Sequence, residues 1–125
     1  MSEEKNTLAL VIEDDPAQQN IFSHAIKDAG YDVEIIGNGT EAIQRLDEVT
    51  PALVVLDLHL PSVSGDEILR YIRADERLAS LSVILATADP ILAETLSAES
   101  DLVLLKPISF IQLRDLATRL LNSSA

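Results

Sequence analysis

The sequence predicts an α/β protein with a five-stranded parallel sheet in a doubly wound (βα)5 arrangement. Five short apolar runs are rich in Val, Ile and Leu, and most are continuous rather than alternating. Such runs are typical of strands that are covered on both faces. The segments between the runs have the period of amphipathic helices. Because the connections are short, right-handed crossovers would place these helices on both faces of the sheet.

The predicted strands are residues 8–12, 33–36, 53–56, 83–86 and 102–105. The second run mixes a charged residue, Glu34, with apolar ones. This mixture favours a strand at the edge of the sheet, where one side faces solvent.

Capping signals mark the start of each predicted helix. Asp15 precedes a proline, and we favour it as the cap of the first helix rather than as a site residue. The later caps are predicted at Thr40, at Ser64 with Glu67, at Asp89 before Pro90, and at Ser109 with Gln112. The first helix is expected to end at Gly30, because glycine is common where helices stop.

The length of 125 residues fits one domain. We expect that domain to occupy residues 8–121, with a flexible leader at 1–7 and a C-terminal tail at 122–125. The chain has no cysteine, which excludes disulfides and thiolate chemistry. Its net charge of -12 repels nucleic acid phosphates, so we expect no direct nucleic acid binding. The apolar runs are far shorter than the roughly 20 residues that a membrane span needs, so we expect a cytoplasmic location.

Polar side chains follow four of the five runs, at the point where each predicted strand ends. Glu13-Asp14-Asp15 follows the first run, Asp57 the third, Thr87 the fourth and Lys106-Pro107 the fifth. In an open parallel sheet these ends lie at one edge, where sites form. Clustered carboxylates repel one another unless a cation lies among them. Hard oxygen ligands select Mg²⁺, or Mn²⁺, over zinc or copper.

Four stretches carry a resemblance to a known family. They are LALVIEDDP, LVVLDLHLPSVSGDEIL, VILATA and LLKP, which span nearly the whole chain. In this order they resemble the receiver domains of two-component response regulators. The resemblance implies a flavodoxin-like fold with strand order 2-1-3-4-5, and a signalling domain that catalyses only its own phosphorylation and slow dephosphorylation.

The resemblance implies a role for each residue at the strand ends. Asp57 matches the aspartate that accepts the phosphoryl group. Asp14 and Asp57 match direct Mg²⁺ ligands, and Glu13 one that acts through water. The backbone carbonyl of His59 matches a further ligand.

Three more positions match residues that surround the phosphoryl group. Thr87 matches the hydroxyl that hydrogen-bonds a phosphoryl oxygen, and Lys106 the ammonium that neutralises another. Ala88 keeps the small side chain expected beside the group. The Lys106–Pro107 peptide is expected to be cis.

The resemblance also implies a phosphohistidine donor, on a sensor histidine kinase or a histidine phosphotransfer domain. Docking is expected on the first helix near Gln18, Gln19 and Phe22, with the loop at Pro107 and Ile108. We expect a monomer or weak dimer. Any DNA-binding effector would need sequence beyond this chain.

Two features depart from the family pattern. Val103 stands where an aromatic residue commonly reports phosphorylation by rotating. The segment 87–106 is a few residues shorter than usual, so we expect the fourth helix to be short or irregular. The output is therefore expected to be weaker, or carried by another face.

Three other functions fit the sequence less well. A phosphorylation-independent pseudo-receiver, acting as an interaction module, is disfavoured because the acids, the threonine and the lysine are all present. A phosphatase of the haloacid dehalogenase type needs an acid two residues after the nucleophile, where His59 stands. A flavin carrier needs a phosphate loop after the first strand, but Glu13-Asp14-Asp15 would repel phosphate unless metal intervened.

Overall fold

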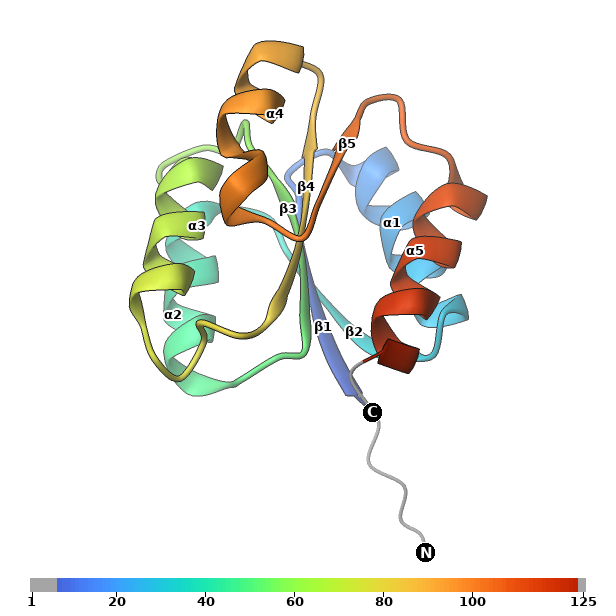
Figure 1. Ribbon diagram of the computed structural model, residues 1–125, viewed down its shortest axis with the longest axis horizontal. Coiled ribbons are helices and arrows are strands. Elements are labelled where there is room, and N and C mark those ends of the chain that lie inside the picture. Colours follow the sequence, from blue (N-terminus) through green and yellow to red (C-terminus); the bar gives the residue numbers. More distant parts are fainter. Residues whose placement is uncertain (1–6, 124–125) are drawn as a thin grey trace, which may run out of the picture.

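The computed structural model describes residues 7–123, and its strands form one parallel sheet in the order β2-β1-β3-β4-β5. The elements alternate as β1 (Thr7–Ile12), α1 (Pro16–Asp28), β2 (Tyr31–Ile36), α2 (Gly39–Glu48), β3 (Leu53–Asp57), α3 (Gly65–Ala74), β4 (Ser82–Thr87), α4 (Pro90–Leu96), the 3-10 turn η1 (Ser97–Glu99), β5 (Leu102–Leu105) and α5 (Phe110–Ser123). Figure 1 shows α1 and α5 on one face, with α2, α3 and α4 on the other. The predicted fold class and strand order are confirmed.

The sheet separates two apolar cores, which explains why its central strands are apolar without alternation. On β1, Leu10 and Ile12 pack into the core beneath α2 and α3, whereas Ala9 and Val11 pack into the core beneath α1 and α5. All four side chains are fully buried. Each large apolar side chain buried in this way contributes about 1.5–3 kcal/mol. Both layers of helices are therefore needed to cover the sheet.

β2 lies at the edge of the sheet, as its mixed sequence predicts. It begins at Tyr31, two residues earlier than the apolar run. Tyr31 is buried, its hydroxyl donates to the carbonyl of Ala117 on α5 at 3.0 Å, and burial raises its pKa to about 12. Ile35, near the other end of β2, is 47% exposed. The edge strand is thus buried at both ends, at Tyr31 and Ile36, and exposes Ile35 between them.

Most of the expected helix caps are present, with one correction. Asp15 caps α1 by accepting the N–H of Gln18 at 2.9 Å, and Ser64 forms the capping box of α3 with Glu67. Ser109 accepts the N–H of Gln112 at 2.9 Å at the start of α5.

The cap of α2 is Asn38, so the prediction of Thr40 is wrong. Asn38 has an extended backbone, and its side chain accepts the N–H of Glu41 at 2.9 Å. Thr40 lies inside the helix and its hydroxyl donates to Ser62 Oγ at 3.0 Å. Both residue types are good caps, but the hydroxyl of Thr40 is bonded to Ser62, and Asn38 accepts the N–H at the helix start.

The ends of the predicted segments shift by one or two residues. α1 ends at Asp28 with Ala29 as its cap, and Gly30 follows with a positive φ of 113° that favours glycine. β1 begins at Thr7, and α5 extends to Ser123, two residues into the predicted tail. The rest of the predicted leader and tail, residues 1–6 and 124–125, lies outside the described residues.

The fourth helix is short, as expected. α4 has seven residues and passes directly into η1. Its N-cap is Asp89, whose carboxylate accepts the N–H groups of Ile91 and Leu92. Within residues 7–123, none of the helices combines the length and apolar character that crossing a membrane requires.

Candidate functional site

Each residue singled out at a strand end lies at the same edge of the sheet. Glu13 and Asp14 follow β1, Asp57 is the last residue of β3, Thr87 ends β4, and Lys106 follows β5. They meet because parallel strands present their carboxyl ends together. The register places Asp57 opposite Ala86, so Thr87 lies one residue further along the neighbouring strand.

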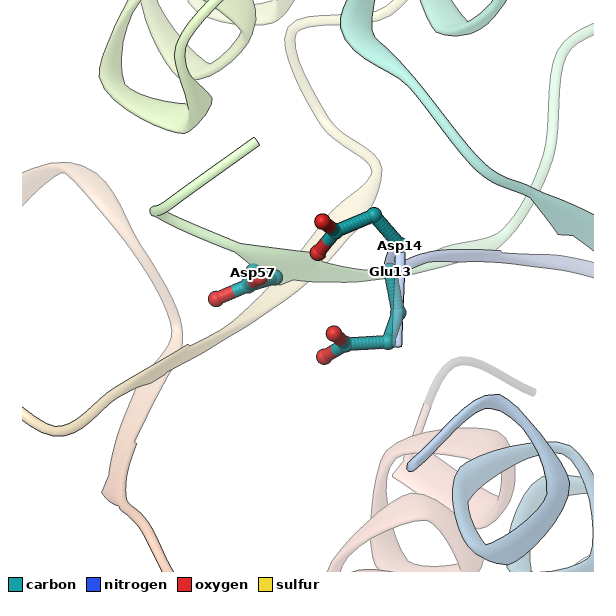
Figure 2. Close-up of side chains that lie close together, drawn as sticks. All are labelled: Glu13, Asp14 and Asp57. Carbon is teal, nitrogen blue, oxygen red and sulfur yellow. The ribbon is translucent and has the colours of Figure 1, made fainter. Parts of the chain in front are cut away.

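Three carboxylates converge at this edge. Glu13, Asp14 and Asp57 each offer one oxygen, and these oxygens all lie within 4.8 Å of one another. Figure 2 shows the three side chains directed toward a shared space. Glu13 and Asp57 are buried at 1% and 3% exposure, whereas Asp14 is exposed. An oxygen-only set with one open side suits a hard divalent cation that keeps several waters.

Glu13 shows the electrostatic strain of this cluster. Burial raises the pKa of its carboxyl group, and the nearby charge of Asp57 raises the pKa further. The N–H of Asp15, which donates to Glu13 Oε2 at 3.1 Å, and the ammonium of Lys106 act in the opposite direction. Burial dominates, so the negative charge of Glu13 is only partly compensated by the protein itself.

Lys106 is the cation that the fold places against the acids. Its Nζ lies 3.2 Å from Asp57 Oδ1 and 3.4 Å from Glu13 Oε1. The Lys106 side chain is 18% exposed. Its backbone N–H donates to the carbonyl of Thr87 at 2.8 Å, and the Lys106–Pro107 peptide is cis, as expected. One ammonium thus faces two buried carboxylates.

The turn after β3 also contacts the Asp57 carboxylate. The N–H of His59 donates to Asp57 Oδ1 at 3.3 Å, while the His59 side chain is exposed, as expected. Asp57 therefore accepts from a backbone donor and from the lysine on the same oxygen. The other oxygen of this carboxylate is the one left for a further partner.

Gly65 is a site residue that the sequence reasoning missed. A Cβ at this position would lie 2.5 Å from the carbonyl oxygen of Asp57 and 2.6 Å from the Cα of Leu58. Only glycine allows α3 to begin this close to the end of β3. The sequence does contain a signal for this residue: a glycine directly after the Ser64 cap, at a position where glycine does not favour helix formation.

Thr87 is fully buried, and its hydroxyl already has a partner. Its Oγ1 accepts the N–H of Asp89 at 3.1 Å. Asp89 in turn caps α4, so the cap interpretation of this aspartate holds. The hydroxyl of Thr87 therefore links the site edge directly to the start of α4.

A pocket of about 390 Å³ lies beside the site. It is lined by Gln18, Ile21, Phe22, Lys106, Pro107 and Ile108. Four of the five residues expected at a docking surface are in this lining. Gln19 is not, because its side chain turns inward and donates to the carbonyl of Glu13 at 2.7 Å.

Fold and site together define a class of protein: a doubly wound α/β domain with an acidic cluster and a lysine at its strand ends. Residues 9–118 match the family described as response regulator receiver domain. This chain belongs to that family.

Curated relatives agree with this assignment. The transcriptional regulatory protein TrcR of Mycobacterium tuberculosis is 35% identical over 113 residues, which cover 89% of this chain and 42% of TrcR. The DNA-binding response regulator MtrA of Mycolicibacterium smegmatis is 34% identical over 79 residues, covering 63% of this chain and 33% of MtrA. This chain thus spans less than half the length of these relatives.

Solved structures share the fold. The signal receiver domain of a LuxO repressor homologue from Vibrio parahaemolyticus is 28% identical, with a TM-score of 0.85 over 96% of this chain and 93% of that one. The signal receiver domain of a histidine kinase from Syntrophus aciditrophicus is 29% identical, with a TM-score of 0.83 over 94% and 91%.

Proposed function

We propose that Asp57 accepts a phosphoryl group from a phosphohistidine, in a reaction that depends on Mg²⁺. The observation that carries the proposal is the position of Lys106 Nζ, 3.2 Å from Asp57 Oδ1, opposite the acidic cluster. A lone buried carboxylate would be costly. Here the Asp57 carboxylate lies beside the exposed Asp14 and beside a cation that can balance added negative charge.

The transfer is a displacement at phosphorus. An oxygen of Asp57 forms the new P–O bond while the P–N bond to the donor imidazole breaks, and the electron pair stays on the ring nitrogen. Charge spreads over the phosphoryl oxygens during transfer, and positioning and charge balance are the main sources of rate. Lys106 and the hydroxyl of Thr87 are the groups of this chain that would contact these oxygens. In slow self-dephosphorylation, water attacks the phosphorus, releasing inorganic phosphate and the Asp57 carboxylate.

The residues present fit a divalent cation. Asp14 and Asp57 would bind it directly, Glu13 through water, and the carbonyl of His59 would complete the protein ligands. When bound, Mg²⁺, or Mn²⁺ in its place, would supply positive charge next to the transferring group. The raised pKa of Glu13 supports this assignment, because the protein leaves the burial of that charge incompletely offset.

The pocket beside the site is the proposed docking surface for the donor. Ile21 is 42% exposed and, with Pro107 and Ile108, offers an apolar surface next to Lys106. We propose that a sensor histidine kinase or a phosphotransfer domain docks here, in the cytoplasm, with this chain as a monomer or weak dimer. DNA binding is part of the name of the relative MtrA. The charge of -12 argues against direct nucleic acid binding by this chain.

The experiment is incubation with acetyl phosphate and Mg²⁺, followed by intact mass measurement. We expect a mass gain of one phosphoryl group that is lost in Asp57→Asn. Asp32→Asn, at an exposed position on β2, is the matched control and should keep the gain. Absence of any gain in the unmodified chain would favour a phosphorylation-independent interaction module instead. A gain that persists in Asp57→Asn would place the acceptor elsewhere.

A further inference from the structure

Gln19 lies in α1, but its side chain is bonded to the end of β1. Its Nε2 donates to the carbonyl oxygen of Glu13 at 2.7 Å. The side chain is half-buried, and a Cβ built on Gly37 would lie 3.7 Å from Nε2, in ordinary contact. The amide group therefore fits between the ends of β1 and β2.

The carbonyl of Glu13 lies where strand pairing stops. β1 ends at Ile12, and the N–H of Glu13 still donates to the carbonyl of Ile36 at 3.0 Å. The carbonyl of Glu13 itself lies past the last residue pair of the sheet and, within residues 7–123, has no partner in a neighbouring strand. A buried carbonyl without a partner costs about 1–3 kcal/mol. Gln19 supplies the partner from a helix.

This hydrogen bond acts on the next residue. The carbonyl of Glu13 and the N–H of Asp14 belong to one planar peptide unit. Holding the oxygen end of that plane restricts its rotation, and so limits the directions in which the Asp14 side chain can leave the backbone. Asp14 needs such a restraint more than its neighbours, because it is exposed while Glu13 and Asp57 are held by packing.

We propose that Gln19 is a positioning residue for the divalent-metal site. By holding the Glu13–Asp14 peptide, it keeps the carboxylate of Asp14 directed toward Asp57 before the cation arrives. Ordering a ligand in advance lowers the entropic cost of binding. The inference rests on the proposed function, because it requires Mg²⁺ to bind among these acids.

The test is Gln19→Met, which removes the donor but keeps the length and helix propensity of the side chain. Titration calorimetry of the unphosphorylated chain with Mg²⁺, and separately with Mn²⁺, should show affinity about 10-fold weaker than that of the unmodified chain, in the range seen when groups that orient metal ligands are removed. Gln44→Met, at an exposed position on α2, is the matched control and should bind like the unmodified chain. Gln19→Ala is a second variant with the same expected loss.

Thermal melts without metal separate positioning from simple stabilisation. A lower Tm for Gln19→Met with unchanged Mg²⁺ affinity would overturn the inference, because the bond would then serve only the fold. Equal affinity and equal Tm would overturn it as well. If the unmodified chain and Gln44→Met bind no Mg²⁺, the proposed metal site itself is wrong and the inference falls with it. Weaker Mg²⁺ binding in Gln19→Met and Gln19→Ala, with normal binding in the unmodified chain and in Gln44→Met, supports the inference.

Discussion

At the scale of single residues, the charge balance of the site depends on Lys106. It is the ammonium that contacts both buried carboxylates, Glu13 and Asp57. Among residues 7–123, the acidic cluster consists of carboxylates alone. The same nitrogen that now faces Asp57 is placed to meet the charge that a phosphoryl group would add.

Replacing this lysine should therefore slow phosphorylation. We expect Lys106→Met to reduce the rate with acetyl phosphate on the order of 10²-fold, the loss typical when one charge-stabilising donor is removed. Lys27→Met, at an exposed position in the last turn of α1, is the control and should react at the normal rate. The rates are measured by mass spectrometry over time. An unchanged rate in Lys106→Met would contradict the assigned role.

The tight packing around Gly65 leads to a second prediction about a single residue. Gly65→Ala places a Cβ 2.5 Å from the carbonyl oxygen of Asp57, so the backbone must shift. We expect a loss of about 1–3 kcal/mol in the free energy of unfolding, the usual range for overpacking. Urea unfolding measures it. Gly37→Ala, whose Cβ would meet its nearest neighbour at 3.7 Å, should cost much less. Similar losses in the two variants would contradict the steric argument.

At the scale of elements, two substitutions at the start of α2 test whether Asn38 or Thr40 is its cap. Asn38→Ala removes the side chain that accepts the N–H of Glu41, and should cost about 1 kcal/mol of unfolding free energy. Thr40→Ala removes only an exposed hydroxyl bond to Ser62, and should cost less than about 0.5 kcal/mol because alanine is the better helix former. Chemical denaturation of both variants gives the comparison. The reverse order would restore Thr40 as the cap.

The contact between α2 and the edge strand β2 predicts a pH dependence. Arg45 makes two bonds to Glu34, at 2.7 and 2.8 Å, and this pairing lowers the pKa of Glu34. A carboxyl group with a lowered folded pKa stabilises the protein above its unfolded pKa of about 4.3. That contribution is lost as the pH falls through the folded pKa.

Glu34→Gln should therefore be less stable than the unmodified chain at pH 7, and the difference should shrink below pH of about 4. Because both side chains are more than a third exposed, solvent screening keeps the effect small. Urea unfolding across this pH range measures it. A difference that stays constant with pH would show that the Glu34 charge contributes nothing.

Two ends of the α4 segment are anchored differently. Its start is linked to the site through Thr87 and Asp89. At the end of η1 and just after it, Arg73 of α3 donates to the carbonyl of Glu99 at 2.8 Å and pairs with Asp101 at 3.3 Å. The start of α4 is thus linked to the site, and the segment that follows α4 is linked to α3.

At the scale of the whole molecule, this anchoring bears on how phosphorylation would be transmitted. Val103 is half-buried on β5 and has no ring to move between buried and exposed positions. We expect amide hydrogen exchange with Mg²⁺ and the phosphoryl mimic beryllofluoride to change at the site turns and on faces other than α4. Large changes in protection confined to residues 87–106 would contradict this expectation. Beryllofluoride with Asp57→Asn is the control and should leave exchange unaltered.

The order of elements, the edge position of β2 and the residues gathered at the strand ends could all be predicted from the sequence alone. These features are local or periodic: a continuous apolar run requires cover on both faces, and parallel strands must bring Glu13, Asp57, Thr87 and Lys106 to one edge. The resemblance to receiver domains supplied the strand order and the assigned roles.

Other features depend on contacts between segments that are distant in the sequence, and these could not be predicted. Asn38 rather than Thr40 caps α2, because the loop that carries Ser62 claims the threonine hydroxyl. Gly65 is required by its distance to the backbone of Asp57. Gln19, expected on the docking surface, turns instead to the carbonyl of Glu13. In each case the local sequence allows more than one conformation at nearly equal energy. The contact with the packed neighbour then selects one of them.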